Sequence, residues 1–243
     1  MFITDITLLN MANVIIFLYI RNRNQNNCIM INELDLKNPF DGISNYESFK
    51  AKCRDIAGEL FTSYGIECNN KIFRLAEIEF YYYDSEQYLN DPSHHKWQEV
   101  TYPRNDYKGG ELFYHLSGID ICFDSQYNEE SGRFGGILIR SIKDGYRIIA
   151  GPLNCKDEIL NACKNEKMPK LIEVKVSERR SIKLNSTYRS LGKTGTDIHD
   201  GLCFFDGSLV KDDWNPKRDR FDTKTGRIES KKSSYDTSKF MSV

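Results

Sequence analysis

Two carboxylates and a phenol occupy alternate positions in one short stretch: Glu77, Glu79 and Tyr81 are separated by Ile78 and Phe80. Because successive side chains of a β-strand point to opposite faces, the three polar groups share one face. The two apolar residues then enter the core. A row of acid–base groups is costly to bury without partners, so we expect it to face a polar cleft or water. The alternative is an ordinary solvent-facing edge strand.

Aromatic and imidazole rings are dense around these carboxylates. Flat rings beside an acid or base suit a nucleobase pocket, since bases stack on ring faces and form hydrogen bonds at their edges. The same rings could instead be ordinary core and interface residues. They include Tyr81, Tyr82, Tyr83, Tyr88, His94, His95, Trp97, Tyr102, Phe113, Tyr114 and His115.

Six short motifs follow one another through this part of the chain. They lie at residues 77–81, 93–94, 104–105, 110–114, 118–124 and 138–140. In order, they read E-x-E-x-Y, Ser-His, Arg-Asn, a Gly before an aromatic strand, a Gly before a second strand, and a closing Arg. This order resembles the alkyladenine (3-methyladenine) DNA glycosylases of the alkylpurine type. Flanking residues agree, so the resemblance spans roughly residues 45–210.

The resemblance implies a monofunctional DNA glycosylase of base excision repair, which hydrolyses the N-glycosidic bond of damaged or modified purines. Breaking that bond builds positive charge on the sugar, which a carboxylate can stabilise while it aligns the attacking water. By its place in the motif, Glu79 is the general base, and Arg140 lies beside the flipped nucleotide. No lysine matches a nucleophile position, so no Schiff base and no cofactor are implied.

The same resemblance implies a base pocket. Tyr81, Tyr114 and one of His94 and His95 match the rings that sandwich the flipped base, and Asp124 matches a residue that screens purine edges. The choice between the two histidines stays open, because the connection that follows Tyr81 is longer than in the family.

One position departs from the family. Aligned from Gly118, Ser117 stands where the family inserts an aromatic side chain into the gap left by the flipped base. Serine cannot fill an unstacked base step. Either a neighbour replaces it (His115, Tyr107 or Leu116), or the protein acts on single-stranded or otherwise unusual DNA. A third interpretation is a non-catalytic nucleic-acid or nucleotide binder of the same fold.

The formal net charge of -1 gives no general attraction to nucleic acid, so DNA binding has to come from a local patch. Residues 164–193 hold nine basic and three acidic side chains, a difference of +6. We expect Arg179, Arg180 and Lys183 to dock phosphates of double-stranded DNA, with single-stranded DNA as an alternative. A solvated basic surface is the competing interpretation.

Seven cysteines are scattered along the chain without a C-x-x-C pair. This pattern argues against a zinc site and predicts free thiols in a reducing cytoplasm, where the protein would meet the nucleoid. Residues 6–20 are apolar but broken by Asn10 and Asn13, and are too short for a confident membrane span. We therefore expect a cytoplasmic, metal-free monomer without a membrane partner.

The scaffold for these residues is predicted from apolar spacing. Helical spacing predicts a helix over 46–62, whose apolar side packs on the core, and a shorter helix over 156–164. Alternating or continuous apolar runs predict strands over 71–82, 111–124 and 134–142. Residues 171–184, within the basic tract, alternate in places between apolar and polar side chains, which predicts further strands or a hairpin.

The expected fold class is α+β, a single domain with a curved, mainly antiparallel β-sheet and flanking helices. We expect this glycosylase-like domain to occupy residues 31–210. Residues 1–30 look like an N-terminal extension outside the fold, with a short hydrophobic anchor as the alternative. Residues 211–243 are polar and nearly lack large aliphatic side chains, which predicts a loosely packed tail.

Overall fold

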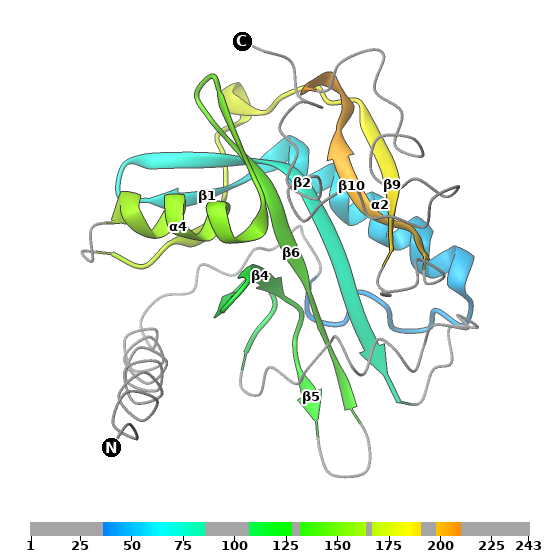
Figure 1. The fold of residues 1–243 in the computed structure, drawn as a ribbon. Coiled ribbons are helices and arrows are strands. Elements are labelled where there is room, and N and C mark those ends of the chain that lie inside the picture. Colours follow the sequence, from blue (N-terminus) through cyan, green and yellow to red (C-terminus); the bar gives the residue numbers. More distant parts are fainter. Residues whose placement is uncertain (1–35, 86–106, 128–131, 164–166, 191–197, 210–243) are drawn as a thin grey trace, which may run out of the picture. The chain divides into compact units, whose positions relative to one another are not determined.

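A computed structural model describes residues 36–85, 107–127, 132–163, 167–190 and 198–209 of the chain (Figure 1). The expectations for the N-terminal extension, for His94 and His95, and for the polar tail lie outside these residues.

Antiparallel strands form the body of the fold. Their order is β3-β4-β6-β2-β1-β8, while β10 joins β2, β9 joins β10, and β5 and β7 join β6. The curled antiparallel sheet with its helices confirms the predicted α+β class. The strands are β1 (Tyr64–Cys68), β2 (Lys71–Asp84), β3 (Leu112–His115), β4 (Gly118–Cys122), β5 (Gln126–Tyr127), β6 (Gly132–Asp144), β7 (Arg147–Ala150), β8 (Lys170–Glu173), β9 (Leu184–Ser190) and β10 (Ile198–Asp206).

Strand β2 holds the sheet together because it pairs along both of its edges. Strand β6 runs beside it from Arg74 to Asp84. On the other edge, β1 pairs with the start of β2, and β10 pairs with residues 77–79. The β2–β6 ladder is irregular near Glu77, where Ala76 on one strand and Arg140 on the other have no cross-strand partner.

Helix α2 (Tyr46–Ser63) covers the apolar face of the sheet, as its spacing predicts (Figure 1). The Asn45 side chain caps its start by accepting a hydrogen bond from the Ser48 amide at 2.9 Å. Its buried face includes Phe49, whose ring lies 4.6 Å from that of Phe40 and 5.9 Å from that of Tyr82. Burial of these rings against β2 and β10 is the main apolar contribution to this side of the fold.

Two predicted elements have different limits in the structure. Residues 111–124 form a hairpin of β3 and β4 and not one strand, because the chain turns at Leu116 and Ser117. Gly118 follows the turn where a Cβ atom would lie 2.8 Å from Leu138 and 2.9 Å from Pro152. Helix α4 (Pro152–Cys163) starts earlier than predicted and packs on β4 and β6.

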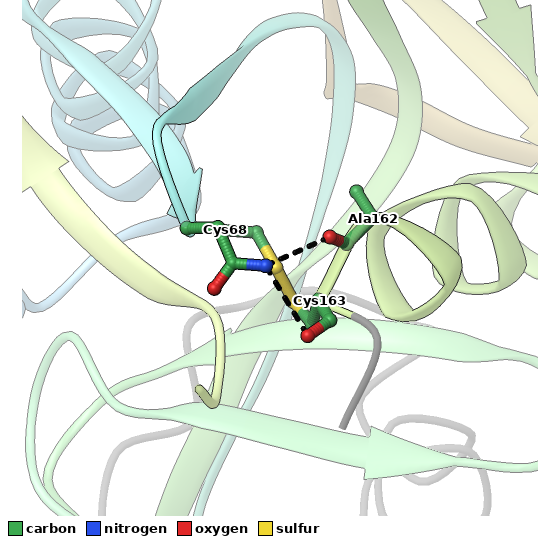
Figure 2. The surroundings of a disulfide bond; sticks show 4 residues. Cys68, Ala162 and Cys163 are labelled. Carbon is green, nitrogen blue, oxygen red and sulfur yellow. Dashed lines mark hydrogen bonds between the residues drawn. A yellow bond between two sulfur atoms is a disulfide. The ribbon is translucent and has the colours of Figure 1, made fainter. Parts of the chain in front are cut away.

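The prediction of free thiols is wrong for two cysteines. Cys68, at the end of β1, forms a disulfide with Cys163, the last residue of α4, with 5.3 Å between their Cα atoms (Figure 2). Asn69, which has a positive φ of 56°, donates from its side chain to the Ala162 and Cys163 carbonyls. The turn between β1 and β2 is thus tied to the end of α4, and cysteine spacing no longer argues for a reducing compartment.

The other described cysteines form no disulfide, and all of them are buried: Cys53, Cys122, Cys155 and Cys203. Cys28 lies outside the described residues.

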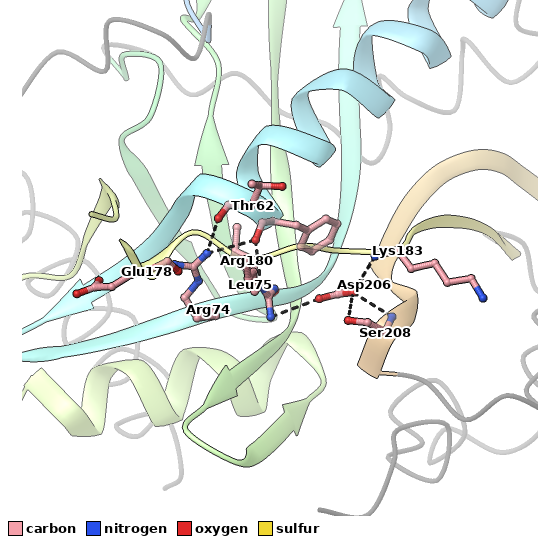
Figure 3. A network of polar contacts seen from close by, with 9 residues as sticks. Thr62, Arg74, Leu75, Glu178, Arg180, Lys183, Asp206 and Ser208 are labelled. Carbon is pink, nitrogen blue, oxygen red and sulfur yellow. Dashed lines mark hydrogen bonds and ion pairs between the residues drawn. The ribbon is translucent and has the colours of Figure 1, made fainter. Parts of the chain in front are cut away.

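Two arginines donate hydrogen bonds to the last carbonyl groups of α2 (Figure 3). Arg74 donates to the carbonyls of Phe61 and Thr62, at 3.3 and 2.7 Å. Arg180 donates from Nε to Phe61 at 3.0 Å and from Nη2 to the carbonyl of Leu75. The final carbonyls of a helix have no partner within it and carry its negative dipole end, so two guanidinium groups are favourable there.

Asp206 offsets part of the positive charge that these arginines bring together. It lies 3.4 Å from Arg180 and accepts hydrogen bonds from the amide and hydroxyl of Ser208 at 3.0 and 2.6 Å. Burial lowers the pKa of Arg180, which Asp206 opposes, and burial followed by repulsion from Arg180 lowers the pKa of Arg74. The Arg180 side chain therefore links α2, β2 and β10 through its hydrogen bonds and its ion pair.

We expect Arg180→Met to lower the free energy of unfolding by about 2–4 kcal/mol, because it removes charged hydrogen bonds to two backbone carbonyls and the ion pair with Asp206. Arg179→Met is the matched control, since the exposed Arg179 forms an ion pair with the exposed Glu173 and such pairs contribute little. Urea denaturation of both variants measures the difference. Equal losses of unfolding free energy in the two variants would show that the contacts of Arg180 do not stabilise the fold.

Candidate functional site

The two glutamates of the polar row meet Arg140 in a buried cluster. Arg140 Nη1 lies 2.5 Å from Glu79 Oε2, and its Nε lies 3.4 Å from Glu77 Oε1. Glu77 also accepts hydrogen bonds from the Ser141 hydroxyl at 3.0 Å and from the Cys203 thiol at 3.5 Å. The row therefore faces neither water nor an open cleft, and its charges are compensated within the protein.

The register of the β2–β6 ladder explains how one arginine reaches both carboxylates. Leu75 pairs with Ile142 and Ile78 pairs with Ile139, so the register is the same on both sides of the irregular region and places Arg140 across from Glu77 and diagonal to Glu79. Directly opposite and diagonal neighbours on one face of a sheet are close enough for long side chains to meet. The backbone of Arg140 is held by the Gly151 amide, which donates to its carbonyl at 2.8 Å.

Arg140 stays charged in this site although it is buried. Burial alone lowers the pKa of the guanidinium, but the negative charge of Glu79, followed by Cys203 and Tyr81, raises it above its ordinary value. A buried charge is tolerated only where an opposite charge and hydrogen bonds compensate it. The geometry therefore fits the structural ion pair that is the simplest explanation of an arginine in a buried strand.

The pairing register identifies which further side chains share the face of Glu79. Cys203 and Leu138 lie beside Glu79 on β10 and β6, and Asp120 on β4 lies beside Leu138. Two strand spacings separate Glu79 from Asp120, about 10 Å between their backbones. Asp120 is 3 % exposed and lies 3.2 Å from His115 Nε2, so a second acid with a histidine lies on this face.

The predicted base-binding residues do not all lie on this face. Tyr81 does, since it alternates with Glu79 and pairs with Gly136. Tyr114 pairs with Ile119, one position out of phase with Asp120, so the register places it on the opposite face from Glu79. The structure therefore does not form the predicted sandwich of Tyr81 with Tyr114, because strand pleating separates them.

Tyr114 and Asp124 have other surroundings. The Tyr114 hydroxyl is buried without a hydrogen-bond partner among the described residues, and burial, with a smaller effect of Tyr107, raises the pKa of the phenol. Asp124 follows β4 and accepts a hydrogen bond from the Gly109 amide at 2.5 Å. Asp124 thus holds the chain that enters β3.

Ser117 lies with Leu116 in the turn between β3 and β4. Leu116 is 84 % exposed, the highest value among the exposed large hydrophobic side chains of the described residues. Lys156 on α4 supports the turn by donating to the carbonyls of His115 and Leu116 at 2.9 and 2.8 Å. Of the three neighbours that could replace an aromatic wedge, His115, Tyr107 and Leu116, only Leu116 is exposed to solvent. The sequence alone did not distinguish among the three.

The basic tract is only partly available for phosphates. Arg180 donates to protein carbonyls and pairs with Asp206, so the expectation that it docks DNA is corrected by its burial. Arg179 is exposed and forms an ion pair with Glu173. The Lys183 side chain is exposed, while its carbonyl accepts from the Gly207 amide at 2.6 Å.

Removal of the buried Arg140 guanidinium should strongly destabilise the fold. We expect Arg140→Met to lower the free energy of unfolding by about 3–5 kcal/mol, because it leaves Glu77 and Glu79 buried beside each other. Adding Glu77→Gln and Glu79→Gln to that variant should recover a large part of the loss. Arg147→Met is the control, because Arg147 is 59 % exposed in its pair with Asp144 and should change stability little. Thermal and urea unfolding curves give the comparison.

No known family model, curated protein or solved structure matches this chain. Within the described ranges, the helices are all too short or too polar to cross a membrane. A cluster of three or more histidine, cysteine, aspartate or glutamate side chains suited to a metal ion is likewise not found in this part of the chain. The functional assignment therefore depends on the chain's own residues.

Proposed function

We propose that the protein is a DNA glycosylase that hydrolyses the N-glycosidic bond of damaged or modified purines. One observation carries the proposal: Glu79 and Arg140, which come from motifs more than 60 positions apart, are in direct contact on one face of the sheet. Tyr81 and Cys203 complete that face around them. The order of the motifs along the chain supports the same assignment.

The chemistry required of Glu79 is modest. As the base leaves, the C1′–N bond breaks and its electrons go to the base, while positive charge develops on the sugar. Glu79 stabilises that charge, accepts a proton from the attacking water and directs the water oxygen to C1′. Arg140 orients Glu79 and keeps it ionised by proximity, and the base gains its proton from solvent.

The burial of Glu79 restricts this mechanism. Its side chain exposes none of its surface, so a substrate reaches the carboxylate only after a change in the chain around it. The same observation favours the second candidate, a protein that binds nucleic acid or nucleotide with this fold and has no turnover. In that case the Glu79–Arg140 pair is purely structural.

Excision of a base by the full-length protein tests the proposal. Oligonucleotides that carry hypoxanthine, ethenoadenine or alkylpurines are incubated in duplex and single-stranded form, and abasic sites are cleaved with alkali. We expect cleavage by wild type and a loss of at least about a hundredfold in Glu79→Gln, since a general base contributes that much. Glu47→Gln, on the exposed start of α2, is the control and should retain full activity.

Comparable rates in Glu79→Gln and wild type would move the general base elsewhere, first to Glu77. Binding without cleavage of any substrate by wild type would replace the enzyme by the non-catalytic binder.

The exposed Leu116 leads to a second expectation for duplex substrates. Extruding a base costs a few kcal/mol of stacking and pairing, and an apolar side chain in the gap recovers part of it. Leu116→Ala should therefore slow excision from matched duplex by roughly tenfold, about 1.4 kcal/mol, and leave excision from single strands unchanged. Val176→Ala, also strongly exposed at 77 %, is the control. Equal effects on both substrates would exclude a wedge role.

A further inference from the structure

The β3–β4 hairpin carries a chain of hydrogen bonds that the proposed glycosylase does not use. Asp120 Oδ1 lies 3.2 Å from His115 Nε2, and His115 Nδ1 lies 3.1 Å from Ser117 Oγ. Asp120 is 3 % exposed, the His115 side chain is 15 % exposed, and Ser117 is exposed. A buried carboxylate, a mostly covered imidazole and an exposed hydroxyl thus follow one another toward the surface.

The partners assign the roles of the two imidazole nitrogens. An ionised carboxylate only accepts hydrogen bonds, so Nε2 of a neutral His115 carries the proton that it shares with Asp120. Nδ1 is then the nitrogen with a lone pair, and it accepts the Ser117 hydroxyl proton. This is the order of orienting acid, general base and nucleophile that activates serine in acyl transfer.

The hairpin register builds this arrangement from six consecutive residues. Phe113 pairs with Asp120 and His115 pairs with Gly118, so His115 and Asp120 are diagonal neighbours on one face. The Phe113 ring stacks on the His115 ring, with 5.8 Å between centroids and 18° between planes. Gly118 has no side chain to come between the imidazole and Leu138. The imidazole is therefore held in place by packing and by both of its nitrogens.

Lys156 supplies a positive charge next to the nucleophile. Its ammonium binds the carbonyls of His115 and Leu116 with two of its three donors. It therefore lies beside the residue that precedes Ser117 in the turn. An ammonium group there can stabilise negative charge on an oxygen of a group that reacts with Ser117.

We propose that Ser117 is an activated nucleophile that accepts an acyl or phosphonyl group from small activated esters. Ser117 Oγ attacks the electrophilic carbon or phosphorus, and its proton moves to His115 Nδ1. The bond to the leaving group breaks, and the leaving group takes its electron pair and that proton. For an acyl group, water then adds by the same route, gives its proton to His115, and releases the acid as the proton returns to Ser117.

The position of Ser117 limits the substrate. A hairpin tip offers room for an unhindered electrophile, and the exposed Leu116 favours an apolar chain over a charged one. This activity is independent of base excision, because it needs neither Glu79 nor Arg140.

An alkyl fluorophosphonate, which forms a stable phosphonyl ester with activated serines and releases fluoride, tests the proposal. Full-length protein is labelled, digested and analysed by mass spectrometry for the modified residue and its rate. We expect Ser117 to be labelled at least about a hundredfold faster than the exposed Ser177, because a positioned general base contributes that much. Ser177→Ala should leave the labelling of Ser117 unchanged.

Variants separate activation from simple exposure. Ser117→Ala should abolish the label, and Asp120→Asn, which keeps the size of the side chain, should slow it about tenfold or more. His115→Gln should reduce it to the rate of Ser177, with circular dichroism checking that each variant is folded. Labelling of Ser117 at the rate of Ser177 in wild type, or an unchanged rate in folded Asp120→Asn, would overturn the proposal.

Discussion

The ladder between β2 and β6 is the interaction on which the other features depend. It joins the two longest described strands, and its register places Arg140 across from Glu77 and diagonal to Glu79. A shift of this ladder by one residue would move every buried charge of one strand to the opposite face. The cluster of Glu77, Glu79 and Arg140 therefore favours this register in addition to the apolar core.

The two faces of β2 are stabilised in different ways. One face is aromatic, with Phe80 5.6 Å from Phe204 and 6.3 Å from Phe123, and it gains stability from the area it buries under α2. The other face contains buried charges that are compensated by ion pairs and hydrogen bonds within the protein. Packing on the first face tolerates changes of shape, whereas the second loses its balance when a single partner is removed.

Local patterns in the sequence predicted part of this arrangement well. The alternation around Glu79 gave the strand and its polar face, and apolar spacing gave α2, because both periodicities are properties of one segment. The contact of Arg140 with both glutamates depends on the register between strands that are far apart in the sequence, which local patterns do not determine. The sequence patterns did not reveal the turn at Leu116, because residues 111–124 read as one strand. They did not reveal the face of Tyr114 or the role of Arg180 either, because pairing and contacts between separate elements decide both.

The bond between Cys68 and Cys163 closes a loop with a sequence separation of 95, which contains both glutamates, Arg140 and the β3–β4 hairpin. A single proteolytic cut anywhere between the two cysteines would therefore leave one covalent molecule. The two pieces would separate on a denaturing gel only after reduction. Nicked protein would migrate as intact under non-reducing conditions, so its integrity has to be judged with a reductant present.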